Sequence, residues 1–299
     1  MSNNILKIGI PKGSLEKATI ELFQNAGWKI SVSSRNYFPS IDDNELSCSL
    51  VRAQEMARYV ESGVLDAGLT GLDWIMDTEA DVELISDLVY SKVSTQKARW
   101  VLAVPANSDI KTLEDLTGKT ISTELVNYTR RFFNDRNIQV NVEFSWGTTE
   151  AKVAEGLVDA IVEVTETGTT IKAHGLRIIY TLFETNTKFI ANKNSMLNSW
   201  KKNKIRQVAL LLRGALNAEN MVGLKMNVPE EKLEGVITIL PSLNAPTIAK
   251  LYGTEWFSVE TVISEGIVRE LIPRLIQLGA DGVIEYSLNK VVGEKDLFT

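Results

Sequence analysis

Residues 62–67 have the sequence Ser-Gly-Val-Leu-Asp-Ala, and residues 155–160 echo it as Glu-Gly-Leu-Val-Asp-Ala. In both segments a helical pattern ends near a glycine, and an apolar strand pattern follows. The echo is too short to establish a duplication, but it fits a protein with two lobes of similar construction.

Strand and helix patterns alternate on both sides of these segments. An apolar strand pattern at 5–10 ends at Pro11, and the helical pattern after it ends at Gly27. Further strands are predicted at 46–51, 65–69, 99–104 and 119–122, and further helices at 53–62 and 125–136. This alternation predicts an α/β fold.

The predicted strands divide between two lobes. The second lobe should begin near residue 95, and the strands predicted at 176–182 and 188–191 should return the chain to the first lobe. The expected limits are 1–95 plus 185–220 for lobe I and 96–184 for lobe II. A small-molecule site is then expected in the cleft between the lobes.

The last part of the chain, 221–299, follows a connecting helix predicted at 192–216 and has a different order of elements. The predicted elements are a strand (222–228), a helix (229–240), two strands (247–252 and 256–263), a helix (266–278) and a strand (282–288). This βαββαβ order is that of the ferredoxin-like unit. The predicted fold class is α/β: a two-lobed part resembling periplasmic binding proteins of type II, and a C-terminal ferredoxin-like domain.

Composition limits the classes of function. The chain has 299 residues, of which 38 are acidic and 32 basic, and its net charge is -6. It has no dense block of lysine and arginine, which argues against nucleic-acid binding. A single histidine, His174, excludes a multi-histidine metal centre. A single cysteine, Cys48, excludes an internal disulfide, and its alternating surroundings predict a buried strand position.

Two targeting patterns are missing from the sequence. No apolar run approaches the roughly 18 residues that a membrane-spanning helix needs, so no membrane interaction is expected. The first residues lack the pattern of a secretory signal peptide, which predicts a cytoplasmic protein.

The segment 159–170 carries the strongest chemical signal. An apolar strand pattern runs into a turn that contains two acids and several hydroxyls: Glu163, Thr165, Glu166, Thr167, Gly168, Thr169 and Thr170. Backbone N–H groups at a helix start bind anions, and a glycine lets the backbone approach closely. The carboxylates suit a ribose diol or Mg²⁺. The alternative is a capped helix start, in which a threonine only satisfies unpaired N–H groups.

A second candidate is Lys12 in residues 10–15, Ile-Pro-Lys-Gly-Ser-Leu. A lysine before a helix start favours phosphate or pyrophosphate. The spacing is not that of a Walker loop. A solvated lysine at a turn is the alternative.

Taken together, these motifs resemble the ATP phosphoribosyltransferase family, the first enzymes of histidine biosynthesis. The segments 10–15, 51–52, 59–73 and 165–170 occur in the family's order, and 245–248, 256–262 and 278–283 resemble the C-terminal regulatory domain of the long form. The resemblance covers nearly the whole chain. It implies joining of ATP to phosphoribosyl pyrophosphate, inhibition by histidine, and assembly as a homo-hexamer, with a dimer as the other option.

The resemblance also implies a mechanism. N1 of adenine attacks the anomeric carbon and expels pyrophosphate, so the protein needs no nucleophile of its own. Holding the substrates in line and stabilising the leaving group would supply the rate. Mg²⁺ would be carried mainly by substrate phosphates, with Glu163 as a candidate ligand.

Roles follow for named residues. Thr165 and residues 167–170 would bind phosphoribosyl pyrophosphate, Glu163 and Glu166 would hold its ribose, and Lys12 would face pyrophosphate. The other positions that match the family's cleft are Arg52, Gly71, Asp73, Arg99 and Glu150. Surface salt bridges are the alternative for the charged ones. Thr247 is the candidate effector contact.

Some positions depart from the family or stay open. Ser14 stands where the family commonly has arginine, which puts one nucleotide-phosphate contact in doubt. Glu163-Val164-Thr165 replaces a common Asp-Leu-Val, so the acid reaches further. For Trp100 and Trp146, core packing is favoured over stacking on adenine.

Two other functions fit the same residues. A two-lobed α/β chain with a cleft can be a non-catalytic small-molecule binding or sensing protein. The ferredoxin-like domain can also be the working part of a degenerate enzyme, which would bind histidine without turnover.

Overall fold

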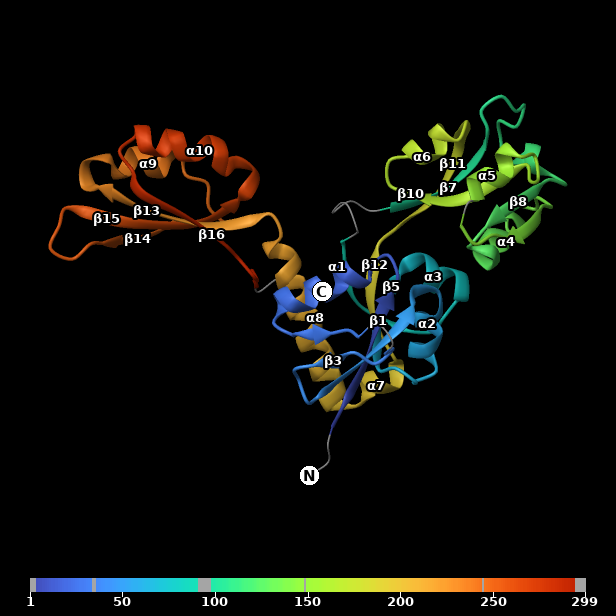
Figure 1. The fold of residues 1–299 in the computed structure, drawn as a ribbon, viewed down its shortest axis with the longest axis horizontal. Helices are drawn as coiled ribbons and strands as arrows, with labels where there is room; N and C mark the ends of the chain where they lie inside the picture. The colour runs from blue at the N-terminus through green and yellow to red at the C-terminus, as the bar shows by residue number, and fades with distance from the viewer. Residues whose placement is uncertain (1–3, 34–35, 91–97, 148, 244, 294–299) are drawn as a thin grey trace. The chain divides into compact units, whose positions relative to one another are not determined.

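The structure is a computed structural model that describes residues 4–33, 36–90, 98–147, 149–243 and 245–293. The chain forms two compact units, Met1–Ala209 and Leu210–Phe298. The boundary between them lies inside helix α8 (Ser199–Ala218). Figure 1 follows the chain through both units.

The first unit begins with a mainly parallel sheet. Its strands are, in spatial order, β4 (Leu46–Arg52), β1 (Leu6–Lys12), β5 (Ala67–Gly71), β12 (Thr187–Ala191) and β6 (Glu83–Leu88). Strand β1 runs parallel to both β4 and β5, whereas β12 runs antiparallel to β5 and β6. Strand β12 belongs to this sheet, as predicted for a chain that returns from the second lobe. Cys48 is buried on β4, as predicted.

Helices connect the parallel strands of this sheet. They are α1 (Glu16–Ala26), α2 (Ala53–Glu61) and α3 (Leu72–Thr78), and a small two-stranded sheet pairs β2 (Ile30–Ser31) with β3 (Ser40–Ile41). Helix α1 ends at Gly27, whose φ of 108° suits a residue without a Cβ.

A second sheet completes the first unit. Its strands are, in spatial order, β11 (Leu176–Thr185), β7 (Ala98–Pro105), β10 (Ala160–Thr165), β8 (Thr120–Thr123) and β9 (Asn141–Phe144). The accompanying helices are α4 (Val126–Asn134), α5 (Thr149–Ala154), α6 (Thr169–Ala173) and a short turn, η1 (Glu114–Leu116). Two such sheets in one unit are the predicted two-lobed, periplasmic-binding-protein-like arrangement. The boundary predicted at residue 95 lies outside the described residues.

The echoed segments have matching local geometry in the two sheets. Asp66, just before β5, accepts a hydrogen bond from Lys7 N on β1 at 2.9 Å, and its own N–H donates to Lys7 O at 2.9 Å. Asp159, just before β10, makes the same pair of bonds with Thr120 on β8, at 2.9 and 3.0 Å. Each aspartate therefore fixes the start of a parallel strand against its neighbour.

The chain leaves the first sheet through two helices rather than the single one predicted at 192–216. They are α7 (Lys193–Leu197) and α8, and the extended backbone of Asn198 separates them. Asn192 accepts a hydrogen bond from Ser195 N and so caps α7. Two lysines fix α8 to the first unit. Lys201 pairs with Asp66 at 2.6 Å, and Lys204, which is buried, pairs with Asp43 at 2.9 Å and Glu45 at 2.7 Å.

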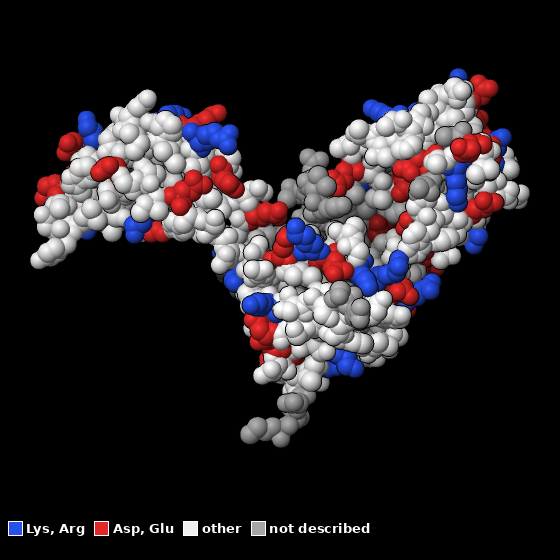
Figure 2. Space-filling model, viewed as in Figure 1, with Lys and Arg blue, Asp and Glu red and all other residues white. Residues whose placement is uncertain are grey.

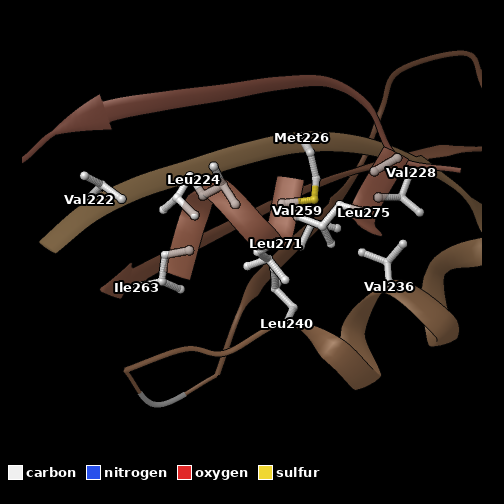
Figure 3. Close-up of a cluster of buried hydrophobic side chains, with 12 residues drawn as sticks. Val222, Leu224, Met226, Val228, Val236, Leu240, Val259, Ile263, Leu271 and Leu275 are labelled. Carbon is white, nitrogen blue, oxygen red and sulfur yellow. The ribbon is translucent and has the colours of Figure 1, made fainter. Parts of the chain in front are cut away.

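The second unit has the predicted βαββαβ order. Its elements are β13 (Met221–Pro229), η2 (Glu230–Lys232), α9 (Leu233–Ile239), β14 (Thr247–Lys250), β15 (Trp256–Ser264), α10 (Glu265–Gln277) and β16 (Asp281–Ser287). The antiparallel sheet has the order β14-β15-β13-β16, and Figure 3 shows side chains of β13, β15, α9 and α10 meeting in its core. The predicted ferredoxin-like fold is therefore confirmed.

Within the described ranges, none of the helices has the length and apolar character needed to cross a membrane. On the face shown in Figure 2, lysine and arginine side chains lie among aspartates and glutamates.

Candidate active site

Three strand ends of the first sheet form one wall of the site. Lys12, Arg52 and Gly71 are the last residues of β1, β4 and β5, and Lys12 pairs in register with Arg52. The carboxyl ends of parallel strands meet at one edge of a sheet, where open α/β folds bind ligands. Residues far apart in the sequence are brought together in this way.

Strand ends of the second sheet form the other wall. Strands β8 and β10 are parallel, and Glu124 and Glu163 lie at their carboxyl ends. Trp100 comes from the start of β7, which runs antiparallel to β10 and pairs Trp100 with Val164. The acidic segment is therefore held by a strand that is paired on both sides.

A cavity of about 560 Å³ lies between these walls. Its lining includes the predicted residues Lys12, Arg52, Gly71, Asp73, Glu163 and Glu166, and also Ser14, Gln54, Tyr90, Glu124, Trp146, Thr185 and Asn186. Arg99, Glu150 and the loop threonines are described but do not belong to this lining. Thr247 lies in the second unit, exposed at the start of β14.

Asp73 is a buried carboxylate at the start of α3. Its Oδ2 accepts a hydrogen bond from Trp100 Nε1 at 2.8 Å, and its Oδ1 accepts one from Trp74 N at 2.9 Å. Burial raises the pKa of Asp73, and these hydrogen bonds oppose the rise. A Cβ on Gly71 would lie 2.0 Å from Oδ1, so only glycine leaves room for the carboxylate.

Glu163 is an acid of the cavity whose pKa is strongly raised. Burial raises its pKa to about 7, and the nearby carboxylates of Glu150 and Glu124 add to the rise. The Val164 N–H donates to Glu163 Oε1 at 3.1 Å and lowers the pKa in part. The site therefore holds a glutamate that is partly protonated near neutral pH.

The turn after β10 is closed by its own hydroxyls. Thr165 Oγ1 accepts from Gly168 N at 2.8 Å, and the hydroxyls of Thr167 and Thr169 lie 2.8 Å apart. Gly168 has φ of 78°, and a Cβ there would lie 3.2 Å from Ile178 Cδ1. It would lie 3.9 Å from Arg99 Nη2, which places Arg99 behind the turn. The Thr169 N–H at the start of α6 donates to Thr167 Oγ1 at 3.3 Å, which is the kind of contact that the helix-capping alternative predicted.

The two tryptophans differ. Trp100 is buried, as predicted from core packing. Trp146 is 58% exposed and lines the cavity, so the prediction that it packs in the core is wrong. Nothing in its neighbouring sequence distinguishes it from a core aromatic.

Glu124 is a lining residue that the sequence analysis missed. Glu124 immediately follows β8, and its carboxylate accepts hydrogen bonds from the Gly147 N–H and the Gln54 side chain. Burial raises the pKa of Glu124, and the charge of Asp73 adds to the rise. The sequence did carry a signal, because Glu124 lies two residues after the strand predicted at 119–122. The structure pairs this strand in parallel with the one that carries Glu163.

Among the residues that the structure describes, no group of three or more His, Cys, Asp or Glu side chains could hold a metal ion. Individual carboxylates do line the cavity, those of Asp73, Glu124, Glu163 and Glu166. Mg²⁺ is commonly bound by one or two carboxylates together with substrate phosphates. This donor set fits a metal that arrives with a substrate.

Comparisons with known proteins agree over nearly the whole chain. Residues 52–214 match the family described as ATP phosphoribosyltransferase, and residues 218–290 match the one described as HisG, C-terminal domain. The chain is 63% identical over 290 residues to an ATP phosphoribosyltransferase of Solidesulfovibrio magneticus, covering 97% of this chain and 99% of the relative. It is 62% identical over 287 residues to one of Desulfatibacillum aliphaticivorans, covering 96% and 98%.

Among solved structures, the ATP phosphoribosyl transferase (HisG:HisZ) complex from Thermotoga maritima is similar, with a TM-score of 0.60 and 26% identity. The match covers 70% of this chain and 96% of that chain. The fold similarity therefore extends over most of this protein.

Proposed function

Because the chain belongs to the ATP phosphoribosyltransferase family, we propose that the cavity of the first unit is where ATP and phosphoribosyl pyrophosphate react. The reaction yields phosphoribosyl-ATP and pyrophosphate and is the first step of histidine biosynthesis. The observation that carries the proposal is that the strand ends of both sheets, with Lys12 on one wall and Glu163 on the other, line one cavity.

The two walls of the cavity would bind different parts of the substrates. Glu163 and Glu166 would accept hydrogen bonds from the ribose hydroxyls of phosphoribosyl pyrophosphate, and residues 167–170 would bind its 5′-phosphate. Lys12, Ser14 and Arg52 offer donors and positive charge to pyrophosphate or the ATP phosphates. N1 of adenine would then attack the anomeric carbon as its bond to pyrophosphate breaks.

Catalysis would rest on placement and electrostatics rather than on a protein nucleophile. Holding both substrates in line removes most of the entropic barrier, and fixed donors stabilise the charge that develops on pyrophosphate. Carboxylates near the anomeric carbon would stabilise its positive character. Mg²⁺, when bound through substrate phosphates, neutralises part of the pyrophosphate charge.

The second unit is proposed to be the regulatory domain, residues 221–299, with free histidine as its effector. A match to the family's C-terminal domain over 218–290 supports this role. Thr247 remains the candidate contact. A homo-hexamer is the proposed assembly, and the cytoplasm is the proposed location.

A glycine substitution tests the site. Gly168→Val places a branched side chain at φ of 78° beside Ile178, and we expect it to abolish turnover while circular dichroism stays native. Gly175→Val is the matched control, because Gly175 has φ of 72° but open space around its Cβ. Activity retained by Gly168→Val would remove the turn from the site.

A further inference from the structure

Four described aromatic side chains line the cavity, of which Trp100 and Tyr90 are buried, Trp74 is half-buried and Trp146 is exposed. Trp100 is 2% exposed and its indole N–H is committed to Asp73. Tyr90 is 8% exposed and its hydroxyl bonds Thr19 at 2.7 Å. Trp74 packs edge-on against Trp100. Trp146, at 58% exposed, is therefore the lining aromatic that offers a ring face to a ligand.

The backbone holds Trp146 in place on both sides. The N–H of Ser145 donates to Thr123 O at 3.0 Å, and the N–H of Gly147 donates to the Glu124 carboxylate. Ser145 is itself buried, and its Oγ accepts a hydrogen bond from Thr149 Oγ1 at 3.2 Å. The residues on both sides of Trp146 are thus hydrogen-bonded to the end of β8.

The Trp146 indole has one cationic and one aromatic neighbour. The Arg52 guanidinium lies over the ring, 4.8 Å from its centroid, and reaches it from the opposite wall of the cavity. Phe144 meets the ring edge-on, with centroids 6.2 Å apart. A planar, delocalised group is therefore what the ring face of Trp146 accepts.

We propose that Trp146 is the stacking surface for the purine base of ATP, with Arg52 occupying that face until the nucleotide binds. The inference rests on the proposed function of the cavity. Of the two substrates, only ATP carries an aromatic ring, since phosphoribosyl pyrophosphate consists of a sugar and phosphates. Displacement by the base would free the Arg52 guanidinium for phosphate oxygens nearby.

Steady-state kinetics give the first test. Stacking of a base on an aromatic side chain is worth about 1–3 kcal/mol, so we expect Trp146→Ala to raise the KM for ATP by about 5- to 150-fold. The KM for phosphoribosyl pyrophosphate should change by less than about 2-fold, because the substitution removes a contact that only ATP makes. Trp146→Phe should restore most of the affinity for ATP.

Fluorescence gives a second readout that does not need turnover. Titration with ATP should quench the emission of the wild type and of Trp256→Phe, a control in the second unit, and the quench should be lost in Trp146→Phe. Ribose 5-phosphate should leave the emission unchanged.

Three results would overturn the proposal. They are an unchanged KM for ATP in Trp146→Ala, an equal rise in both KM values, and a phenylalanine variant as impaired as the alanine one. If any one of these results occurs while wild-type turnover is normal and Gly168→Val is inactive, the cavity remains the active site and only the role of Trp146 is wrong. If Gly168→Val is active, the turn does not belong to the site, and the role of Trp146 is judged from the KM values alone.

Discussion

Replacing Glu163 by glutamine should make the ligand-free protein more stable above neutral pH. The folded-state pKa of about 7 lies above the ordinary 4.5, so the folded protein binds this proton more tightly than the unfolded chain does. The stability that this proton contributes is fully present below pH 4.5, the ordinary pKa of glutamate, and it is lost as the pH rises through about 7. The difference between the two pKa values corresponds to about 3 kcal/mol.

Glutamine resembles the protonated carboxyl but never ionises. We therefore expect Glu163→Gln to exceed the wild type by about 3 kcal/mol at roughly pH 8.5, and by less than about 1 kcal/mol at roughly pH 5. Urea unfolding at both pH values, followed by tryptophan fluorescence, measures the two differences. Turnover should fall, because an acid in the cavity is lost.

The matched control is Glu143→Gln on β9, an exposed glutamate of the same sheet. It should change stability by less than about 0.5 kcal/mol at either pH. A gain in Glu163→Gln that is the same at both pH values, or no gain at the higher one, would refute the burial argument.

Three further changes test other parts of the structure. Gly71→Ala drives a Cβ into the Asp73 carboxylate, so we expect at least about 10-fold lower kcat/KM and a stability loss of about 2–4 kcal/mol by urea unfolding. Lys204→Met leaves two carboxylates without their buried partner and should cost about 1–3 kcal/mol of stability. Lys193→Met, at an exposed ion pair, should leave the stability nearly unchanged. The Cys48 thiol, whose pKa burial raises to about 12, should resist iodoacetamide until the protein unfolds; labelling of the native protein would contradict its buried position.

The sequence allowed most of the architecture to be predicted, because apolar periodicity and glycine positions mark element ends. Gly27 ends α1, and the order of strands and helices in the second unit is as expected. The aspartates of the two echoed segments proved to have one physical role, the fixing of a strand start. The break at Asn198 was missed, since the apolar pattern continues through it.

The candidate site was predictable only in part. Lys12, Arg52 and Glu163 could be found because each ends a predicted strand or belongs to a family motif. Trp146 could not be placed, since its exposure depends on a loop fixed by backbone hydrogen bonds to residues 123 and 124. Those bonds leave no pattern in the sequence.

The most direct measurement mixes the purified full-length chain with ATP, phosphoribosyl pyrophosphate and Mg²⁺, with pyrophosphatase to pull the reaction. Phosphoribosyl-ATP is followed by ultraviolet absorbance, with and without histidine. We expect product to form and histidine to suppress it. No product, with histidine still raising the melting temperature, would contradict catalysis in this cavity and would leave a protein that only senses histidine.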